Sequence, residues 1–182
     1  TIASSGGVSG THLGRKSGFE ISTTEYGAIM RDQMINTVII STQHDTHARL
    51  VIESLDAGKH VFVEKPLCMT RQELDQIIKV YGDVGARKKL LLMVGFNRRF
   101  SPLTETMKRL LGPITDPKAI VMTVNAGIIP ADHWTQDADA GGGRIIGEAC
   151  HFIDLLRFLT GSPIDKVQTS FMIDPKCSQG MP

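Results

Sequence analysis

Short apolar runs alternate with helix-type patterns through the first half of the chain. Three of the runs are almost continuously apolar and have the length of a buried strand, and they cover 37–41, 60–64 and 90–95. Strands of this kind that alternate with helices are typical of βαβ units, in which a parallel sheet is covered by helices on both faces. The pattern therefore predicts an α/β fold. Residues 1–3 are predicted to be the tail of a further strand, before a Gly/Ser-rich turn at 4–7.

Capping residues mark the helices of this half. Thr70 and Glu73 have the spacing of a capping box, which predicts the start of a helix. Gly58 closes the preceding amphipathic segment, because glycine readily adopts the left-handed conformation that ends helices. The predicted helices cover 24–34, 45–58 and 70–81.

The pattern changes after Pro102. A helix is predicted to about residue 111, an alternating strand over 119–124, a polar glycine-rich loop over 125–143, a helix over 144–159 and a last strand over 165–173. The apolar side chains of the 144–159 helix form one stripe, which is predicted to face the core. Gly147, His151 and Asp154 then lie on the other side. We place a domain boundary between residues 97 and 115.

Composition and charge exclude several classes of protein. Twenty Lys and Arg residues balance nineteen Asp and Glu residues, so the 182-residue chain has a formal net charge of +1 and lacks the basic excess that nucleic acids or anionic membranes attract. No apolar run approaches the length that spans a bilayer. The three cysteines have neither the spacing of a disulfide framework nor that of a zinc site, and the histidines form no metal-ligand group. We therefore predict a cytoplasmic protein without a bound metal.

Polar side chains follow each predicted strand, at the edge where open parallel sheets bind their ligands. They are Ser41 and Thr42 after the first strand, Glu64 and Lys65 after the second, and Asn97 after the third. Lys65 stands out because it ends an apolar strand and precedes Pro66, which favours an extended backbone at the lysine. An amine in that place suits a proton donor or acceptor. The alternative is that the Lys65 ammonium group simply reaches solvent.

Two further features bear on ligand binding. His151 lies off the apolar stripe of its helix, so it either lines a cleft or lies on the surface. The three glycines before that helix, Gly141, Gly142 and Gly143, allow a ligand to approach the backbone closely. The chain contains no G-x-G-x-x-G motif. The early glycines are therefore interpreted as a plain turn rather than a phosphate loop.

Four blocks of the sequence carry a resemblance. They are Ser41-Thr42-Gln43-His44-Asp45-Thr46-His47, Ala57-Gly58-Lys59-His60-Val61-Phe62-Val63-Glu64-Lys65-Pro66, Gly95-Phe96-Asn97-Arg98-Arg99-Phe100, and Gly141-Gly142-Gly143 leading to His151-Phe152-Ile153-Asp154. In this order they resemble the Gfo/Idh/MocA family of NAD(P)-dependent oxidoreductases, over nearly the whole chain. The resemblance implies a partial Rossmann-type parallel sheet over 1–100. It also implies a partial α+β domain with a mostly antiparallel sheet over 101–182.

The resemblance also implies an activity, which is hydride transfer between NAD or NADP and a hydroxyl-bearing carbon of a sugar, cyclitol or nucleotide sugar. Lys65 corresponds to the family's active-site lysine, and His151 to its catalytic histidine. The residues expected at the cofactor are Ser41, Thr42, His47, Glu64, Lys65, Asn97 and Trp134. Those expected at the substrate are Lys65, Glu148, His151 and Asp154. Family habit further implies a homo-oligomer.

Two departures from the family's pattern leave alternatives open. The family commonly has an Asp four residues before the histidine, where this chain has Gly147, so either Glu148 substitutes or Lys65 and His151 act without it. The family's first strand and phosphate loop precede the start of this chain, and more strands are expected after Ile173. We therefore interpret the chain as an internal fragment that binds a dinucleotide weakly, if at all. The alternative functions are a non-catalytic cofactor-binding regulatory or interaction module, and a redox-assisted epimerase or eliminase with bound NAD.

Overall fold

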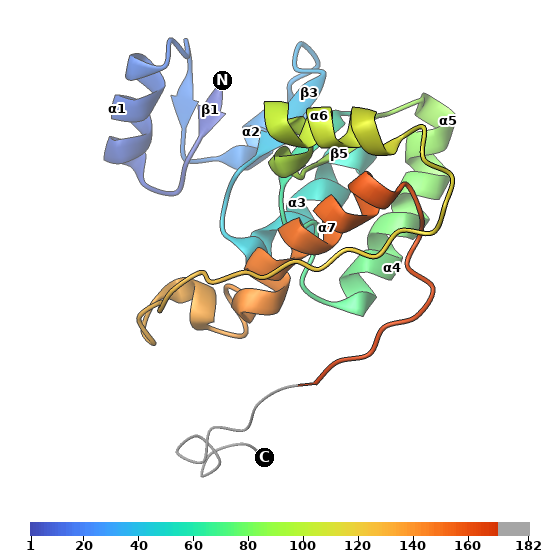
Figure 1. The fold of residues 1–182 in the computed structure, drawn as a ribbon. Coiled ribbons are helices and arrows are strands. Elements are labelled where there is room, and N and C mark those ends of the chain that lie inside the picture. The colour runs from blue at the N-terminus through green and yellow to red at the C-terminus, as the bar shows by residue number, and fades with distance from the viewer. Residues whose placement is uncertain (171–182) are drawn as a thin grey trace.

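Two separate parallel sheets organise the protein. A computed structural model describes residues 1–170. The smaller sheet pairs β1 (Ile2–Ala3) with β2 (Ser22–Thr23), and α1 (Gly7–Lys16) connects them. This unit, dark blue in Figure 1, lies to one side of the rest of the molecule. The short helix α2 (Tyr26–Arg31), which falls within the predicted 24–34 segment but is shorter, leads away from it.

The larger sheet has the strand order β3-β4-β5, and all its pairs are parallel. Its strands are β3 (Thr37–Ile40), β4 (His60–Glu64) and β5 (Leu92–Gly95), with Ile40 beside Val63 and Glu64 beside Gly95. The connecting helices are α3 (His44–Asp56) and α4 (Arg71–Val80), and a π-helical turn η1 (Tyr81–Gly85) and α5 (Ala86–Lys88) follow α4. The prediction of a parallel α/β sheet is therefore confirmed.

The predicted helix signals act as expected. Glu73 N–H donates to the Thr70 hydroxyl, and the Glu73 carboxylate accepts from Thr70 N–H, which completes the capping box of α4. Gly58 has φ +77 directly after α3, in the region that glycine tolerates best. Lys59 and His60 then fix the start of β4. The buried Lys59 Nζ donates to the carbonyls of Asp32 (2.6 Å) and Ile35 (2.7 Å), and His60 Nδ1 accepts from Leu91 N–H (3.0 Å).

A single hydrophobic core lies between the larger sheet and its helices. Its members come from β3, β4, α3 and α4, and include Val38, Ile40, Val61, Val63, Val51, Leu55 and Ile77. The opposite face of the sheet is open, with Ile39 72% exposed. The prediction that helices cover both faces is therefore wrong for the described residues. The reason is that α3 and α4 lie on the same face, while α6 (Pro102–Leu111) packs against α7 (Cys150–Thr160) and a 3-10 turn, η2 (Asn97–Phe100).

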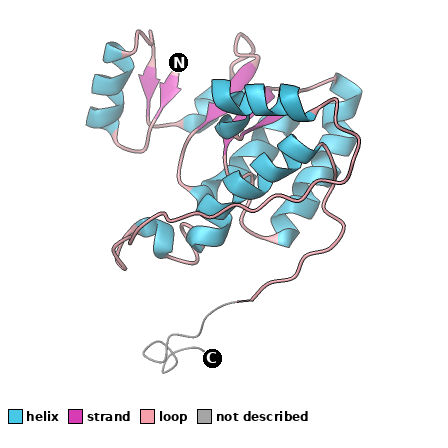
Figure 2. Cartoon of the chain, in the orientation of Figure 1, coloured by secondary structure: helices cyan, strands magenta, loops and turns pink. Residues whose placement is uncertain are grey.

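Beyond β5 the predicted helices form and the predicted strands do not. The helical pieces are η2, α6, a 3-10 turn η3 (Trp134–Gln136), a π-helical turn η4 (Ile145–Ala149) and α7. Residues 119–124 and 165–170 belong to no strand, and 171–173 lie outside the described residues. A strand is stabilised by the neighbour with which it shares hydrogen bonds, and no described segment pairs with either run. The expected antiparallel sheet is accordingly absent from residues 1–170, where Figure 2 draws this part as helices and loops.

The orientation of α7 differs from the one predicted. Gly147 and Asp154 are buried, whereas Ile145 of the apolar stripe is 75% exposed. The stripe was predicted to face the core, and this holds only in part: Leu159 of the stripe is buried, but so are Gly147 and Asp154, which were predicted to lie on the other side. The cause is a set of polar contacts that attach the Gly147–Asp154 face to the edge of the larger sheet. No helix in the described part of the chain is long and apolar enough to cross a membrane.

Candidate active site at the carboxyl edge of the sheet

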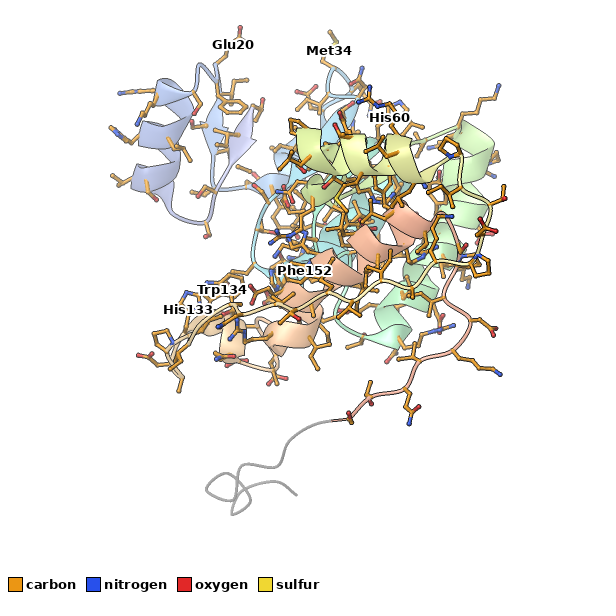
Figure 3. The ribbon with its side chains drawn as sticks, viewed as in Figure 1. Glu20, Met34, His60, His133, Trp134 and Phe152 are labelled. Atoms are coloured by element: carbon orange, nitrogen blue, oxygen red, sulfur yellow. The ribbon has the colours of Figure 1, made fainter. Side chains whose placement is uncertain are left out.

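The carboxyl ends of β3, β4 and β5 meet at one edge, and most of the predicted site residues lie along it. Ser41 and Thr42 follow β3 and are exposed, Lys65 follows β4 and Asn97 follows β5. In Figure 3, His60, at the start of β4, lies in the upper part of the view, and Phe152 and Trp134 lie below it. Parallel strands therefore bring these loops to the side that faces α7.

Lys65 and His151 are brought together although they belong to different parts of the chain. Lys65 Nζ donates a hydrogen bond to the carbonyl of Gly147 (2.7 Å), one turn before His151. Burial first, and then the charges of Lys65 and Arg98, lower the pKa of His151, while Glu64 and Asp154 act in the opposite direction. The imidazole is therefore neutral at pH 7, as a proton acceptor must be.

A cavity of ≈ 410 Å³ lies beside His151. Its walls are Asn97, Arg98, Phe100, Ser101 and His151. The Nδ1 atom of His151 is buried and has no hydrogen-bond partner within the described residues. The ring also lies edge-on to Phe96, with 6.2 Å between the ring centres. Since buried polar atoms normally have a partner, the free Nδ1 marks a position where a ligand or water would complete the hydrogen bonding.

His44 explains why position 147 is glycine. A Cβ atom at Gly147 would lie 3.1 Å from His44 Cε1 and 3.4 Å from the Gly141 carbonyl oxygen, so an Asp there requires His44 to move. His44 is held by Gly141, whose carbonyl oxygen is 2.8 Å from Nδ1, and by Trp134, whose ring packs edge-on to it at 4.9 Å. Burial is the main reason that the pKa of His44 is lowered. The ring is therefore neutral and can donate from Nδ1 to Gly141.

The two carboxylates predicted to contact the substrate bind arginines. Glu148 accepts from Arg144 through Oε2 (3.0 and 3.2 Å), and Arg144 also donates to the Gly127 carbonyl (2.7 Å). Asp154, which is only 7% exposed, accepts both bonds of a bidentate pair with Arg99. Neither carboxylate is bonded to His151. Glu148 and Asp154 therefore act here as partners of arginine.

The other residues predicted to hold a cofactor lie at different depths. His47 is fully buried, with Nδ1 2.7 Å from the Pro66 carbonyl and Nε2 3.1 Å from the Thr42 carbonyl, so it fixes the two loops to each other. The Glu64 carboxylate lies over Gly95, where a Cβ would approach Oε2 to 3.0 Å. Trp134 is partly exposed and packs on His44. Ser41, Thr42 and Asn97 are the exposed members of the set.

Sequence reasoning missed the contacts of His44, Arg98 and Arg99. The Arg144–Glu148 pair has i,i+4 spacing on a helix, a signal that was available in the sequence. The Arg99–Asp154 pair joins residues 55 positions apart, and no local pattern announces such a contact. A second cavity, of ≈ 520 Å³, lies between α3, α4 and the loop before α7 and holds none of the predicted site residues. No three His, Cys, Asp or Glu side chains of residues 1–170 are grouped as a metal site requires.

Parallel strands, a polar carboxyl edge and a lysine–histidine pair define a dinucleotide-type α/β oxidoreductase fold, and comparison with known proteins agrees. The sequence model described as "Oxidoreductase family, NAD-binding Rossmann fold" (GFO_IDH_MocA) matches residues 2–96, which is more than half of the chain. The chain belongs to this Gfo/Idh/MocA family.

Two curated relatives and one solved structure illustrate the similarity. The chain is 31% identical to levoglucosan dehydrogenase of Pseudarthrobacter phenanthrenivorans over 81% of its own length and 38% of the relative's. It is 31% identical to inositol 2-dehydrogenase of Rhizobium meliloti over 87% of its length and 46% of the relative's. The structure of a levoglucosan dehydrogenase in complex with NADH and levoglucosan superposes with a TM-score of 0.72 and 28% identity, over 87% of this chain and 44% of the other. The chain thus spans less than half the length of these relatives.

Proposed function

We propose that the protein is an NAD(P)-dependent oxidoreductase that transfers hydride between the nicotinamide and a hydroxyl-bearing carbon of a sugar or cyclitol. One observation carries the proposal: Lys65, at the end of β4, donates a hydrogen bond to the Gly147 carbonyl (2.7 Å), one helical turn before His151. Family membership supports the reaction class. The names of the relatives, levoglucosan dehydrogenase and inositol 2-dehydrogenase, support a ring that bears several hydroxyl groups.

In the proposed reaction, neutral His151 accepts the proton of the substrate hydroxyl as the carbon–oxygen double bond forms. Lys65 has three N–H groups, of which one binds the Gly147 carbonyl, so two are left to hydrogen-bond the reacting oxygen. Their positive charge stabilises the oxygen as it loses its proton. A bound nicotinamide would supply the hydride acceptor for the same carbon, so that the alcohol would lose one hydride and one proton in total.

The residues at the sheet edge fit the nicotinamide half of such a cofactor. Open parallel sheets bind ligands outside the carboxyl ends of their strands, and His151 and Asn97 both line the cavity at this edge. Ser41, Thr42, Glu64, Asn97 and Trp134 are the residues we assign to the cofactor, and His47 is assigned to the support of their loops. NAD and NADP both remain open. Cytoplasmic location and homo-oligomeric assembly stay predictions from the sequence.

Replacing Lys65 tests the proposal. In the full-length protein Lys65→Met should lower turnover about 10²- to 10⁴-fold, the usual contribution of an acid–base group. Fluorescence titration with NADH should give nearly the same affinity as the parent, because the residues assigned to the cofactor are unchanged. Lys79→Met, on the exposed face of α4, is the matched control and should retain full turnover. Unchanged turnover of Lys65→Met would contradict the assignment.

A second candidate function has its own observation. Gly147 lacks the carboxylate that the family commonly has, and both nearby carboxylates, Glu148 and Asp154, are paired with arginines. This arrangement favours a cofactor-binding module without catalysis. A panel of sugars, cyclitols and nucleotide sugars, assayed for NAD⁺ or NADP⁺ reduction by the full-length protein, separates the two functions. The non-catalytic module is supported if the protein binds the cofactor but converts none of these substrates. It must also show no epimerisation in which a bound NAD is reduced and then reoxidised.

A further inference from the structure

Positive charge prevails around the cavity beside His151. Asp154 is neutralised by Arg99, and Glu148 by Arg144, so neither offers a free carboxylate. Lys65 and Arg98 form no ion pair within residues 1–170. Glu64 is the remaining acidic group that acts on His151, and its carboxylate lies over Gly95 in the sheet. The wall of the cavity itself contains a guanidinium group and no acid.

Arg98 is held in a defined place by an aromatic ring. Its guanidinium carbon lies 4.5 Å from the ring centre of Phe152, the residue next to His151 on α7. Such stacking leaves the N–H groups at the edge of the guanidinium free for an oxyanion. The neighbouring Arg99 differs, because its donors are taken by Asp154. Two adjacent arginines therefore have different roles: Arg99 attaches α7 to the sheet, and Arg98 remains available.

The other polar groups of the cavity narrow the choice of ligand. Ser101 Oγ donates to Thr104 Oγ1 and accepts from Thr104 N–H at the start of α6, so it is already used. Asn97 and Arg98 are exposed and have no hydrogen bond from their side chains within residues 1–170. A neutral polyol would leave the guanidinium without an anionic partner. A carboxylate or phosphate matches its planar arrangement of donors, through two parallel hydrogen bonds.

We propose that the substrate carries an anionic group, a carboxylate or a phosphate, which Arg98 binds while the reacting hydroxyl lies between Lys65 and His151. The proposal rests on the proposed function and specifies its substrate class: a sugar or cyclitol acid, or its phosphate ester. Arg98 is a specificity-determining residue in this scheme.

The test compares substrates that share one ring and differ in charge. Glucose, glucuronate and glucose 6-phosphate are assayed with the full-length protein, next to levoglucosan. The parent should prefer one of the anionic sugars. Arg98→Leu should lower kcat/KM for that sugar roughly 10- to 100-fold, as expected for a charged hydrogen-bonded pair, and should lower kcat/KM for the neutral sugars much less. Arg98→Lys should restore part of the loss. Arg109→Leu, an exposed arginine on α6, is the control and should change nothing.

Each outcome decides between named alternatives. If the parent oxidises neutral sugars at least as well as both anionic ones, the inference fails and the proposed function stands. If Arg98→Leu instead weakens NADH or NADPH binding, Arg98 contacts the cofactor and the inference is also wrong. If no sugar is oxidised, the proposed function fails. Calorimetric titration with glucuronate and glucose 6-phosphate then decides the binding claim, since an equal affinity of parent and Arg98→Leu contradicts it.

Discussion

Strands were predicted both in residues 37–95 and in residues 112–170, but of these two described regions only the first contains strands. In the first, Val38 and Ile40 of β3 and Val61 and Val63 of β4 are buried beneath α3 and α4. In the second, Val121 is 93% exposed and no described segment pairs with it. Apolar alternation identifies residues that can form a strand. A neighbouring strand and a helix to cover it decide whether the strand forms.

The two regions also differ in how they use their polar residues. The interior between sheet and helices in 37–95 is mainly apolar, whereas the helical segment 145–160 meets the sheet edge and η2 through Gly147 of η4 and Asp154 of α7. Its contacts there are hydrogen bonds, from Lys65 to Gly147 and from Arg99 to Asp154. The first region therefore derives its stability from burial. The second is attached to it by a few directional contacts, which are the ones that define the candidate site.

Truncation of an apolar side chain should separate the two regions most strongly. Leu55→Ala removes a fully buried core side chain and should lower the free energy of unfolding by about 2–5 kcal/mol. Ile128→Ala, at a side chain that is 98% exposed, should change it by less than about 0.5 kcal/mol. Urea denaturation followed by circular dichroism measures both. Equal losses would mean that the second region has a core of its own.

The Arg99–Asp154 pair tests the attachment between the regions. Arg99→Ala leaves a carboxylate that is 7% exposed without its partner and should cost roughly 1–3 kcal/mol. The loss is smaller than for a fully buried pair, because the Arg99 side chain is 36% exposed and water can replace part of the contact. Asp154→Asn and the double variant complete a mutant cycle. Because α7 carries His151, the full-length Arg99→Ala protein should also lose kcat while its NADH affinity holds. A coupling energy near zero would refute the role of this pair.

Much of the first region was predictable, because its signals are local. The capping box at Thr70, the stop at Gly58 and the apolar runs of β3 and β4 each act within a few residues. The positions of Ser41, Lys65 and Asn97 followed from one rule about parallel sheets. The division of the chain near residue 100 stays a prediction.

The long-range contacts could not be predicted in the same way. Apolar periodicity located α7 and its buried Leu159 but missed the burial of Asp154, because the partner of Asp154 is Arg99, far away in the sequence. The same reason hid the fit of His44 against Gly147, where a Cβ would approach the His44 ring to 3.1 Å. An apolar pattern indicates which side chains of a helix prefer to be buried. An ion pair with a distant residue can bury a charged side chain of the same helix as well.

His44 joins the two regions as well, and its contribution to stability should depend on pH. Its pKa is lowered in the folded protein, mainly by burial, from the ordinary value near 6.5. As the pH falls through that value, the unfolded chain binds the proton first, so stability is complete above about pH 7 and declines toward pH 5.5. His151, whose pKa is also lowered, adds to the decline.

His44→Gln can still donate to Gly141 but does not titrate, so it should show a smaller fall in the urea midpoint between about pH 7.5 and 5.5. His12→Gln, on the exposed side of α1, is the control and should keep the parent's pH dependence. A parent protein that becomes more stable on acidification over this range would contradict the burial of His44 against the second region.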